Sequence, residues 1–304
     1  MFIGIDFGGT NIRAAVIDRN GNVISKSRIK TESQKGYDYI IENLINFINS
    51  FVNENKIEGI GIGFPGTVSK QGEIVVAPNL GWENVNLKEI LEKKFAIPVI
   101  IDNDVNMAIC GEKWIGAAKD YSDFFMLTIG TGVGGAFYLN NRFYGGVSNN
   151  AGEIGHINLF PEGKICGCGR KGCLEQYASA TSLIEYVYEN LKKFPESNLS
   201  KNDNIEAKHI FDGAKNKDRL SEEAVNYMCE NLARGISAVV NLLNPEAVII
   251  GGGVSHAGDY LIEILKKHVK KYSLDYSYKD FSIKLAKLGD EAGIYGAVSK
   301  FILS

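Results

Sequence analysis

The segment Ile5-Asp6-Phe7-Gly8-Gly9-Thr10 closes an apolar run at the N-terminus and turns the chain into a second run, Ile12–Ile17. A similar stretch, Thr128-Ile129-Gly130-Thr131-Gly132, lies between the apolar runs 125–129 and 133–139. The runs have strand length, and the glycines between them allow a tight turn. The chain therefore contains an internal repeat of a strand-turn-strand unit, which predicts a duplicated α/β architecture.

Each unit continues into a third predicted strand, over 23–29 after Asn20-Gly21 and over 142–146 after Asn140-Asn141. The spacing of apolar residues predicts the remaining elements. Further strands are expected over 57–64, 98–101, 247–250 and 283–285. Helices are expected over 39–51, 174–191, 205–214, 222–243 and 292–303. Two more helices are expected, one that follows Asp104 and ends at Trp114 and one that follows Gly253.

This order of elements predicts two lobes. Residues 1–110 form a small α/β lobe, and residues 111–290 form a larger α/β lobe that is rich in helices. A last helix, at about 291–304, is expected to pack back onto the first lobe. The polar stretch 192–204 is expected to be an exposed loop within the second lobe, because its composition is that of a loop.

The composition excludes several classes of protein. The 304 residues are 45% hydrophobic and 23% charged, which is ordinary for a globular protein, and the formal net charge is −3. No basic surplus points to nucleic acid, and no apolar run approaches the roughly 18 residues that a membrane-spanning helix needs. The N-terminus has no cationic leader. We therefore expect a cytoplasmic protein that binds neither nucleic acid nor a membrane.

Two segments, Gly61–Gly66 and Gly130–Gly135, fit the G-x-G-x-x-G pattern of dinucleotide-binding proteins. That fold needs a helix to open at the turn, whereas Pro65 and the strand-like segment after Gly135 disagree with a helix. The chain also lacks the Gly-Lys-Ser/Thr of a P-loop. Neither class is expected, and each turn taken alone is also compatible with an ordinary tight turn.

The repeated turns suit phosphate binding instead. Their glycines let backbone N–H groups approach an anion closely, and Thr10 and Thr131 add hydroxyl groups. Asp6, at the end of the first strand, is expected to hold magnesium through water. A third cluster, Gly251-Gly252-Gly253, ends a strand and suits the approach of a nucleotide base or sugar. Three glycine turns at strand ends together predict a nucleotide site.

Asp102-Asn103-Asp104 follows a buried predicted strand, and the ends of such strands are where α/β proteins bind ligands. One acid could take a proton from a substrate hydroxyl while the neighbouring amide holds that substrate. Asp and Asn are also favoured at helix N-caps, and for Asp102 in particular this alternative stays open.

Cys166, Cys168 and Cys173 lie within eight residues and alternate with glycines. His156, ten residues upstream, can supply a fourth ligand, and Cys3His is a common tetrahedral zinc set. Free cysteines on a flexible loop, or a disulfide, are the alternatives. In a chain that we expect to be cytoplasmic, clustered Cys with a nearby His indicates a metal site rather than a disulfide.

Together these motifs resemble the ROK family (repressors, open reading frames and kinases), and within it the bacterial sugar kinases of glucokinase type. The resemblance extends from the first strand to the last helix, and the cysteine segment is its most specific part. The matching segments are Asp6–Thr10, Pro78–Trp82, Asn103–Asn106, Gly130–Gly135, Ala151–His156 and Cys166–Glu175.

The resemblance implies a two-lobed actin-like ATPase or ribonuclease H-like fold with a cleft between the lobes. It also implies that Asp104 is the general base toward the sugar 6-hydroxyl. The residues implied to hydrogen-bond the sugar are Asn79, Asn103, Glu153, His156 and Glu175. Those expected to bind the nucleotide and Mg²⁺ are Asp6, Gly8, Gly9, Thr10, Asn11, Gly130, Thr131, Gly132, Gly134, Gly252 and Gly253. The implied ligands of a structural Zn²⁺ are His156, Cys166, Cys168 and Cys173.

The sequence departs from the family pattern in two places. Asn11 stands where many relatives have Lys, and the nearby Arg13 either reaches a phosphate or lies at the surface. Asn149 and Asn150 precede Ala151, where relatives usually carry small residues. Because both lie close in sequence to Glu153, they bear on substrate preference.

The implied activity is ATP-dependent phosphorylation of a hexose in a homodimer or a dimer of dimers. Glucose is the predicted substrate because segments 78–82 and 102–112 look most like those of glucokinases. Kinases of N-acetylmannosamine, N-acetylglucosamine or fructose share the motifs and remain alternatives. A transcription regulator is disfavoured because the first phosphate strand begins at Phe2, and a sugar-binding module without catalysis because Asp6 and Asp104 are intact.

Overall fold

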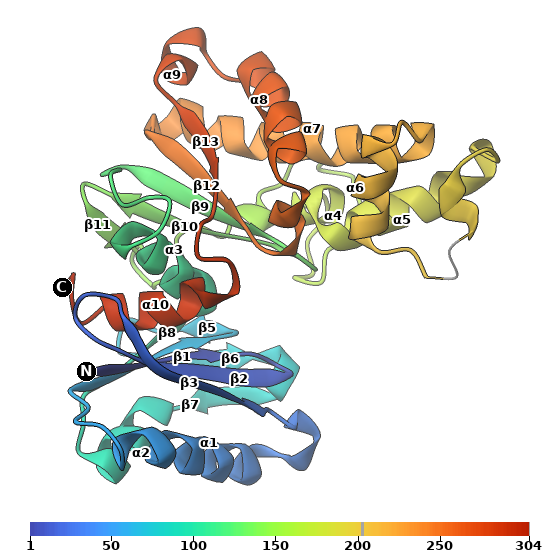
Figure 1. Ribbon diagram of the computed structural model, residues 1–304. Coiled ribbons are helices and arrows are strands. Elements are labelled where there is room, and N and C mark those ends of the chain that lie inside the picture. The colour runs from blue at the N-terminus through green and yellow to red at the C-terminus, as the bar shows by residue number, and fades with distance from the viewer. Residues whose placement is uncertain (202–203, 304) are drawn as a thin grey trace. The chain divides into compact units, whose positions relative to one another are not determined.

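The computed structural model describes residues 1–201 and 204–303 (Figure 1). Within these residues the chain forms two five-stranded sheets and a small three-stranded sheet. The first sheet has the order β3-β2-β1-β4-β8 and the second has the order β11-β10-β9-β12-β13. In each sheet, three strands that are consecutive in the chain lie side by side in reverse order, as β3-β2-β1 and as β11-β10-β9. Two strands from later in the chain, β4 and β8 or β12 and β13, complete the sheet. The internal repeat predicted from the glycine turns is therefore confirmed.

The strands of the first sheet are β1 (Phe2–Phe7), β2 (Asn11–Ile17), β3 (Val23–Lys30), β4 (Gly59–Phe64) and β8 (Val99–Asn103). β1, β4 and β8 are parallel, with Asp6 opposite Gly63 and Gly63 opposite Asp102. Because parallel strands end at the same edge, this register places Asp6 and Asp102 on one edge of the sheet. β8 is longer than predicted, so that Asp102 and Asn103 belong to the strand instead of following it.

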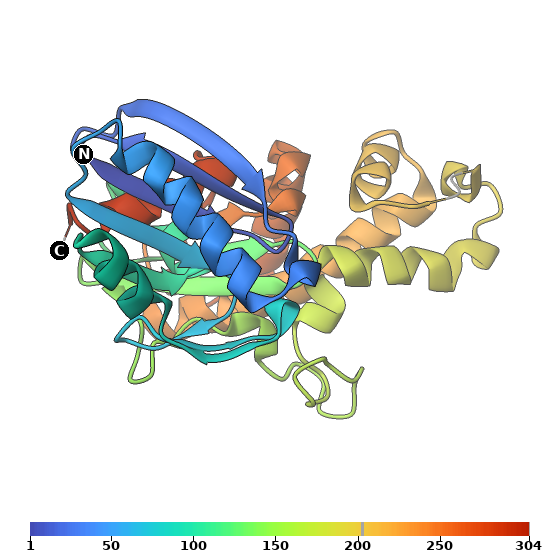
Figure 2. The same cartoon turned by 90° about the horizontal axis from the view of Figure 1, so that it is seen from below.

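Helices cover both faces of the first sheet. The helices α1 (Tyr37–Val52) and α2 (Leu87–Phe95) bury their apolar residues in one core with β1, β2, β4 and β8. In Figure 2, α1 is the blue helix that lies over these strands. On the other face of the sheet, α10 (Ala292–Ser299) packs on Phe2 and Ile17. It ends at Ser299, before the predicted limit of 303.

Glycines bring α10 close to its neighbours. A Cβ atom at Gly4 or Gly61 would overlap the backbone of α10, and one at Gly296 would overlap the backbone of Met107 in α3 (Asp104–Trp114). The helix thus rests with its backbone against the strands, which requires residues without side chains at these positions. This packing sets the position of α3, which begins at Asp104.

The region between the predicted strand at 57–64 and that at 98–101 contains elements that the sequence analysis did not predict. A small antiparallel sheet is formed by β5 (Thr67–Val68), β6 (Ile74–Ala77) and β7 (Trp82–Val85). A short 3-10 helix, Pro78–Leu80, joins β6 to β7. These strands are two to four residues long, too short for a periodic pattern of apolar residues to emerge.

The strands of the second sheet are β9 (Phe124–Ile129), β10 (Val133–Leu139), β11 (Arg142–Tyr144), β12 (Ala247–Gly251) and β13 (Ser282–Leu285). The helices that follow in the chain are α4 (Glu175–Ala178), α5 (Ala180–Asn190), α6 (Ala207–Lys215), α7 (Arg219–Leu243), α8 (Asp259–Tyr272) and α9 (Asp275–Lys279). α7 is amphipathic, and its buried stripe from Leu220 to Val240 carries most of the helical core of this region.

Three predictions in this region need correction. The helix predicted over 174–191 is interrupted at Ser179, whose side chain caps α5 by accepting from the backbone N–H of Ser182. The helix predicted after Gly253 is a 3-10 helix, Gly253–Ala257, and α8 begins only after Gly258. The predicted exposed loop at 192–204 contains 3-10 turns and buries Leu199, although residues 202 and 203 of that loop lie outside the described residues.

The chain divides into two compact units. The first comprises 1–121, 136–151 and 287–304, and the second comprises 122–135 and 152–286. The boundary predicted from the sequence lies near residue 110, with 136–151 in the second lobe. Residues 136–151 belong in sequence to the second repeat unit, so no local sequence signal indicates that they join the first compact unit. Among the described helices, none combines the length and the apolar character that a transmembrane segment requires.

Candidate functional site

The first glycine turn, between β1 and β2, is held by backbone hydrogen bonds and leaves its tip open. The Gly8 N–H donates to Asn11 O at 2.9 Å, and the Thr31 hydroxyl donates to Gly8 O at 2.6 Å. Gly9, Thr10 and Asn11 are exposed, and the space around a Cβ at Gly9 is empty. The turn therefore presents backbone and a hydroxyl group at its surface, as an anion site needs.

Asp6 lies opposite Arg13 in the β1–β2 pair, and the two form an ion pair. Arg13 donates to Oδ2 of Asp6 from Nε at 3.0 Å and from Nη2 at 2.6 Å, while its Nη1 lies 3.2 Å from Oδ2 of Asp290. Burial raises the pKa of Asp6, and the charge of Arg13 partly offsets this effect. The guanidinium of Arg13 thus contacts the carboxylate of Asp6, a residue of the candidate phosphate motif.

The N-terminus of α3 carries the candidate base. Asn103 is the N-cap, since its Oδ1 accepts from the N–H groups of Val105 and Asn106, and its Nδ2 donates to Gly66 O at 3.0 Å. Asp104, the next residue, is half-buried, and its Oδ1 accepts from the Val105 N–H at 2.9 Å. The N-cap role that the sequence left open for Asp102 therefore belongs to Asn103.

The environment of Asp104 suits a proton acceptor. Burial is the largest influence on this carboxyl and raises its pKa to about 6, and the negative charge of Asp6 acts in the same direction. Asp6 and Asp104 are thus electrostatically coupled within the first unit. A carboxyl whose pKa lies near the working pH can accept a proton efficiently and release it again.

Asn79 lies in the 3-10 helix Pro78–Leu80 and is exposed. The segment is anchored by Trp82, which is buried and stacks on Phe64 with ring centroids 5.5 Å apart. Trp82 also lies 6.0 Å from the ring of Phe7, the residue after Asp6. Aromatic burial of this kind accounts for the tryptophan of the Pro78–Trp82 motif, because it fixes the turn that exposes Asn79.

In the second unit, the turn between β9 and β10 is held by residues around α4 and α5. Gly130 O accepts from the Ala180 N–H at 2.8 Å, and Thr131 O accepts from the Thr181 hydroxyl at 2.8 Å. Gly252 has a φ of +79°, and a Cβ there would overlap the backbone of Ile129. The structure therefore brings the Gly252-Gly253 turn beside the Gly130 turn, as a shared nucleotide site in this unit requires.

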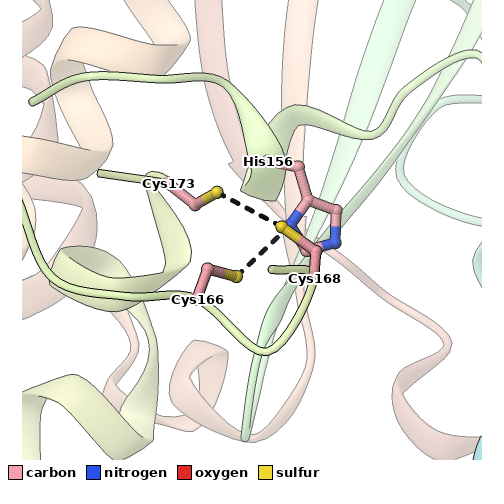
Figure 3. Close-up of side chains that lie close together, drawn as sticks. All are labelled: His156, Cys166, Cys168 and Cys173. Carbon is pink, nitrogen blue, oxygen red and sulfur yellow. Dashed lines mark hydrogen bonds between the residues drawn. The ribbon is translucent and has the colours of Figure 1, made fainter. Parts of the chain in front are cut away.

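The second unit also assembles the predicted metal ligands. The ligand atoms of His156, Cys166, Cys168 and Cys173 all lie within 4.8 Å of one another (Figure 3). Cys166 Sγ is 3.7 Å from His156 Nδ1, and Cys168 Sγ is 3.6 Å from Cys173 Sγ. For a Zn–S bond of about 2.3 Å, the ligands of a tetrahedral site lie roughly 3.8 Å apart, so the donor set fits zinc.

Backbone turns hold the cysteine loop in this shape. The Cys166 N–H donates to Arg170 O at 2.7 Å, and Gly169 and Gly172 have φ values of +83° and +74°. A Cβ at Gly172 would overlap Phe160 O, so that only glycine fits there. A backbone hydrogen bond from Arg170 is the main reason that the pKa of the Cys168 thiol is lowered to about 7, which favours a metal-binding thiolate.

His156 and Glu175 link the cysteines to the candidate sugar residues. His156 directs Nδ1 toward Cys166 and has its Nε2 3.9 Å from Oε2 of Glu153. Glu175, at the start of α4, accepts from Cys166 Sγ at 2.9 Å and lies against Gly132. One cluster thus contains the candidate zinc ligands, the candidate sugar residues Glu153, His156 and Glu175, and a glycine of the candidate phosphate turn.

The structure groups the predicted residues into two sets. The first unit holds Asp6, Gly8, Gly9, Thr10, Asn11, Asn79, Asn103 and Asp104, and the second holds Gly130, Thr131, Gly132, Gly134, Glu153, His156, Cys166, Cys168, Cys173, Glu175, Gly252 and Gly253. Sequence reasoning missed two distant partners of Asp102, Asn149 and Lys300. They lie far from Asp102 in sequence and belong to no motif, so no signal could have identified them.

Comparison with known proteins agrees with this arrangement. A family model described as "ROK family" matches residues 2–302. The glucokinase of Halalkalibacterium halodurans is 37% identical over 306 residues, which cover 97% of this chain and 93% of that protein. A putative xylose repressor of Caldicellulosiruptor is 32% identical, with coverage of 99% of this chain and 78% of the repressor.

Among solved structures, a ROK family glucokinase from Streptomyces griseus in complex with glucose and AMPPNP superposes with a TM-score of 0.83. It is 31% identical, and the match covers 97% of both chains. The two repeated sheets and these neighbours define a protein of the actin-like ATPase fold. Within that class, the chain belongs to the ROK family.

Proposed function

We propose that this ROK protein transfers the terminal phosphoryl group of ATP to the 6-hydroxyl of glucose. The position of Asp104 carries the proposal, because this residue is half-buried at the start of α3 and coupled to Asp6 of the phosphate motif. The similarity to several glucokinases over nearly the whole chain supports the choice of reaction. The Streptomyces griseus relative was solved with glucose and AMPPNP, which supports the same pair of ligands here.

The glycine turns hold the phosphates in this proposal. Thr10 and Thr131 contribute hydroxyl groups, and the backbone N–H groups beside them contribute donors. Phosphoryl transfer is accelerated mainly by alignment and charge neutralisation, so exposed donors on short, well-held turns suit the reaction. Asp6 would hold Mg²⁺ through water, and the ion would neutralise charge on the phosphates. Gly252 and Gly253 leave room for the nucleoside part of ATP.

Asp104 orients the attacking hydroxyl and takes its proton as the bond to phosphorus forms. The Val105 N–H holds one carboxylate oxygen, so the other can face the sugar. Asn79, Asn103, Glu153, His156 and Glu175 bind the sugar hydroxyls. A hexose offers many hydroxyl groups and little apolar surface, which explains a site built from carboxylates and amides.

His156, Cys166, Cys168 and Cys173 bind a structural Zn²⁺ in this proposal. The ion would hold the glycine-rich loop in place, because without it the loop is held by its backbone turns. The ion would take no part in the reaction. His156 would ligate through Nδ1 and keep Nε2 free for the sugar or Glu153. We further propose that the protein is cytoplasmic and forms a homodimer or a dimer of dimers. In each chain, residues 1–110 together with the last helix form one functional lobe, and residues 111–290 form the other.

A coupled assay with ATP and glucose, fructose, mannose, N-acetylglucosamine or N-acetylmannosamine tests this function. We expect the highest kcat/KM for glucose. A higher value for another hexose would move the assignment to a different sugar kinase of the family. Calorimetric binding of sugar without turnover of ATP would instead identify a sugar-binding module.

A further inference from the structure

Asp102 is the centre of a buried hydrogen-bond cluster directly beside the candidate base. The residue as a whole is 6% exposed. Its Oδ1 accepts from the backbone N–H of Asn103 at 2.8 Å, from Nδ2 of Asn106 at 2.8 Å and from Nδ2 of Asn149 at 2.9 Å. Its Oδ2 accepts from Nζ of Lys300 at 2.9 Å. Both oxygens are therefore occupied by protein donors, and the carboxylate is not available to a substrate.

Lys300 approaches Asp102 from the C-terminal end of the chain. It is the C-cap residue of α10, and its Nζ also lies 3.9 Å from the centre of the Phe143 ring. The Lys300 side chain is 18% exposed, and that of Asp102 is 8% exposed. In such surroundings the ion pair is screened little by water, and loss of one partner leaves a buried charge without compensation.

Asn149 approaches Asp102 from the segment after β11. It has a φ of +68°, a left-handed conformation that Asn adopts more readily than most residues. Its Nδ2 donates to Val68 O at 3.1 Å as well as to Asp102. Asn103 donates to Gly66 O, two residues before Val68. Asp102 is thus joined to the 66–68 segment by two routes, through Asn103 and through Asn149.

We propose that Asp102, Lys300 and Asn149 are positioning residues that hold Asp104 in its reactive orientation. The inference rests on the proposed role of Asp104 as the base. Asp102 lies two residues before Asp104, at the junction of β8 and α3, and its carboxylate ties this junction to α10 and to the segment that precedes Glu153. Asp102 is therefore bonded both to the backbone just before the candidate base and to Asn149, which precedes the candidate sugar-binding residue Glu153.

This role explains why a neutral amide and a cation converge on one acid. A catalytic group that is misplaced by about 1 Å can lose on the order of a hundredfold in rate. Without Lys300 or Asn149, the Asp102 carboxylate would bind water or turn toward other donors. The backbone at the β8–α3 junction would then shift, and Asp104 would shift with it. None of the hydrogen bonds described for these three side chains involves the Gly8–Asn11 turn of the same unit, so we expect their loss to affect kcat and to leave the KM for ATP nearly unchanged.

Two variants with matched controls test the proposal. Asn149→Gly removes the amide while allowing the left-handed backbone, and Asn141→Gly does the same at an exposed asparagine that has a φ of +57° in the turn before β11. Lys300→Met removes the cation of the buried pair, and Lys26→Met removes that of the exposed Lys26–Glu291 pair near the start of α10. Lys300→Arg keeps both charge and donor. Each protein is assayed for kcat and both KM values, per folded molecule as judged from its melting curve.

We expect kcat to fall about tenfold or more in Asn149→Gly and Lys300→Met, with the KM for ATP changed less than about twofold. The controls should resemble the wild type, and Lys300→Arg should recover most of kcat. If Lys300→Met does not fold, Asn149→Gly alone decides the matter. A kcat within twofold of wild type in the folded variants, or equal losses in the controls, would overturn the proposal.

Asp104→Ala in the same assay separates this inference from the function on which it rests. If Asp104→Ala retains turnover, the assignment of the base is wrong. If Asp104→Ala is inactive while Asn149→Gly and Lys300→Met keep the wild-type kcat, the base stands and only the positioning role is rejected.

Discussion

Arg13 contacts a single carboxylate oxygen of Asp6 through two of its nitrogens, at 3.0 Å and 2.6 Å. The contact joins adjacent strands, and it places the cation of Arg13 beside the partly buried carboxylate of Asp6. Arg13 also reaches Asp290, just before α10. Arg13, whose role was open from the sequence, thus contacts Asp6 of the candidate phosphate motif Asp6–Thr10.

The first prediction concerns this pair. Arg13→Met should lower kcat/KM for ATP about tenfold, because the charge-assisted contact that orients Asp6 is lost. Steady-state kinetics at saturating glucose measures the effect. Arg19→Met is the control, since Arg19 forms an equally short but exposed pair with Glu58, at 2.6 Å. Equal values for the Arg13 and Arg19 variants would show that the pair serves stability alone.

The second prediction concerns the base. Asp104→Ala should fold and bind glucose, while its kcat falls about a hundredfold or more, because the attacking hydroxyl loses its proton acceptor. Calorimetry measures binding and the coupled assay measures turnover. Turnover at the wild-type rate would remove Asp104 from the mechanism.

The third prediction is a pH dependence of stability. The folded-state pKa of Asp104 is raised to about 6, above its ordinary value of 3.8, so the charged carboxyl destabilises the folded protein. At pH 7 this carboxyl is charged in both states and the full cost is present. Between pH 6 and pH 4 the folded state binds a proton that the unfolded state does not, and the cost declines.

Asp104→Asn should therefore melt at a higher temperature than the wild type at pH 7, because it removes the charge and keeps an acceptor for Val105. The difference should shrink as the pH falls from 6 toward 4. Thermal melts across this range measure it. An advantage that is equally large at pH 4 and pH 7 would contradict the raised pKa.

The fourth prediction concerns zinc. Metal analysis of the purified protein should find about one zinc per chain, and Cys168→Ser should lose both the metal and most of the activity through disorder of its loop. Cys229→Ala, which alters a buried cysteine outside the cluster, should keep the metal. Wild-type protein that is fully active and contains no zinc would exclude the structural role of the ion.

The fifth prediction concerns the close packing of α10 against α3. A Cβ at Gly296 would overlap the backbone of Met107, so Gly296→Ala should lower the free energy of unfolding by about 1–3 kcal/mol. Gly235→Ala in α7 meets only a flexible side-chain atom of Leu174, 2.7 Å from the new Cβ, and should cost less. Chemical denaturation compares the two. A larger loss at Gly235 would mean that the α3–α10 contact adapts easily.

Short-range patterns were enough for much of this protein. The two strand-turn-strand units, the third strands and the long helices follow from apolar spacing and turn glycines, which act over a few residues. The cysteine cluster was also predictable, because three ligands lie in one short loop whose glycines dictate its turns. By contrast, the strands β5, β6 and β7 were too short to leave a period, and the 3-10 turns in 191–201 were hidden by polar composition.

The sequence by itself determined the repeat, the family and the list of candidate site residues, because these are written in contiguous motifs. Only the tertiary structure decided which partners those residues have. Arg13 reaches Asp6 across a strand pair, and Asn149 and Lys300 reach Asp102 from segments 47 and 198 residues away. Contacts over such separations depend on how sheets and helices pack, and a single sequence contains no local signal for them.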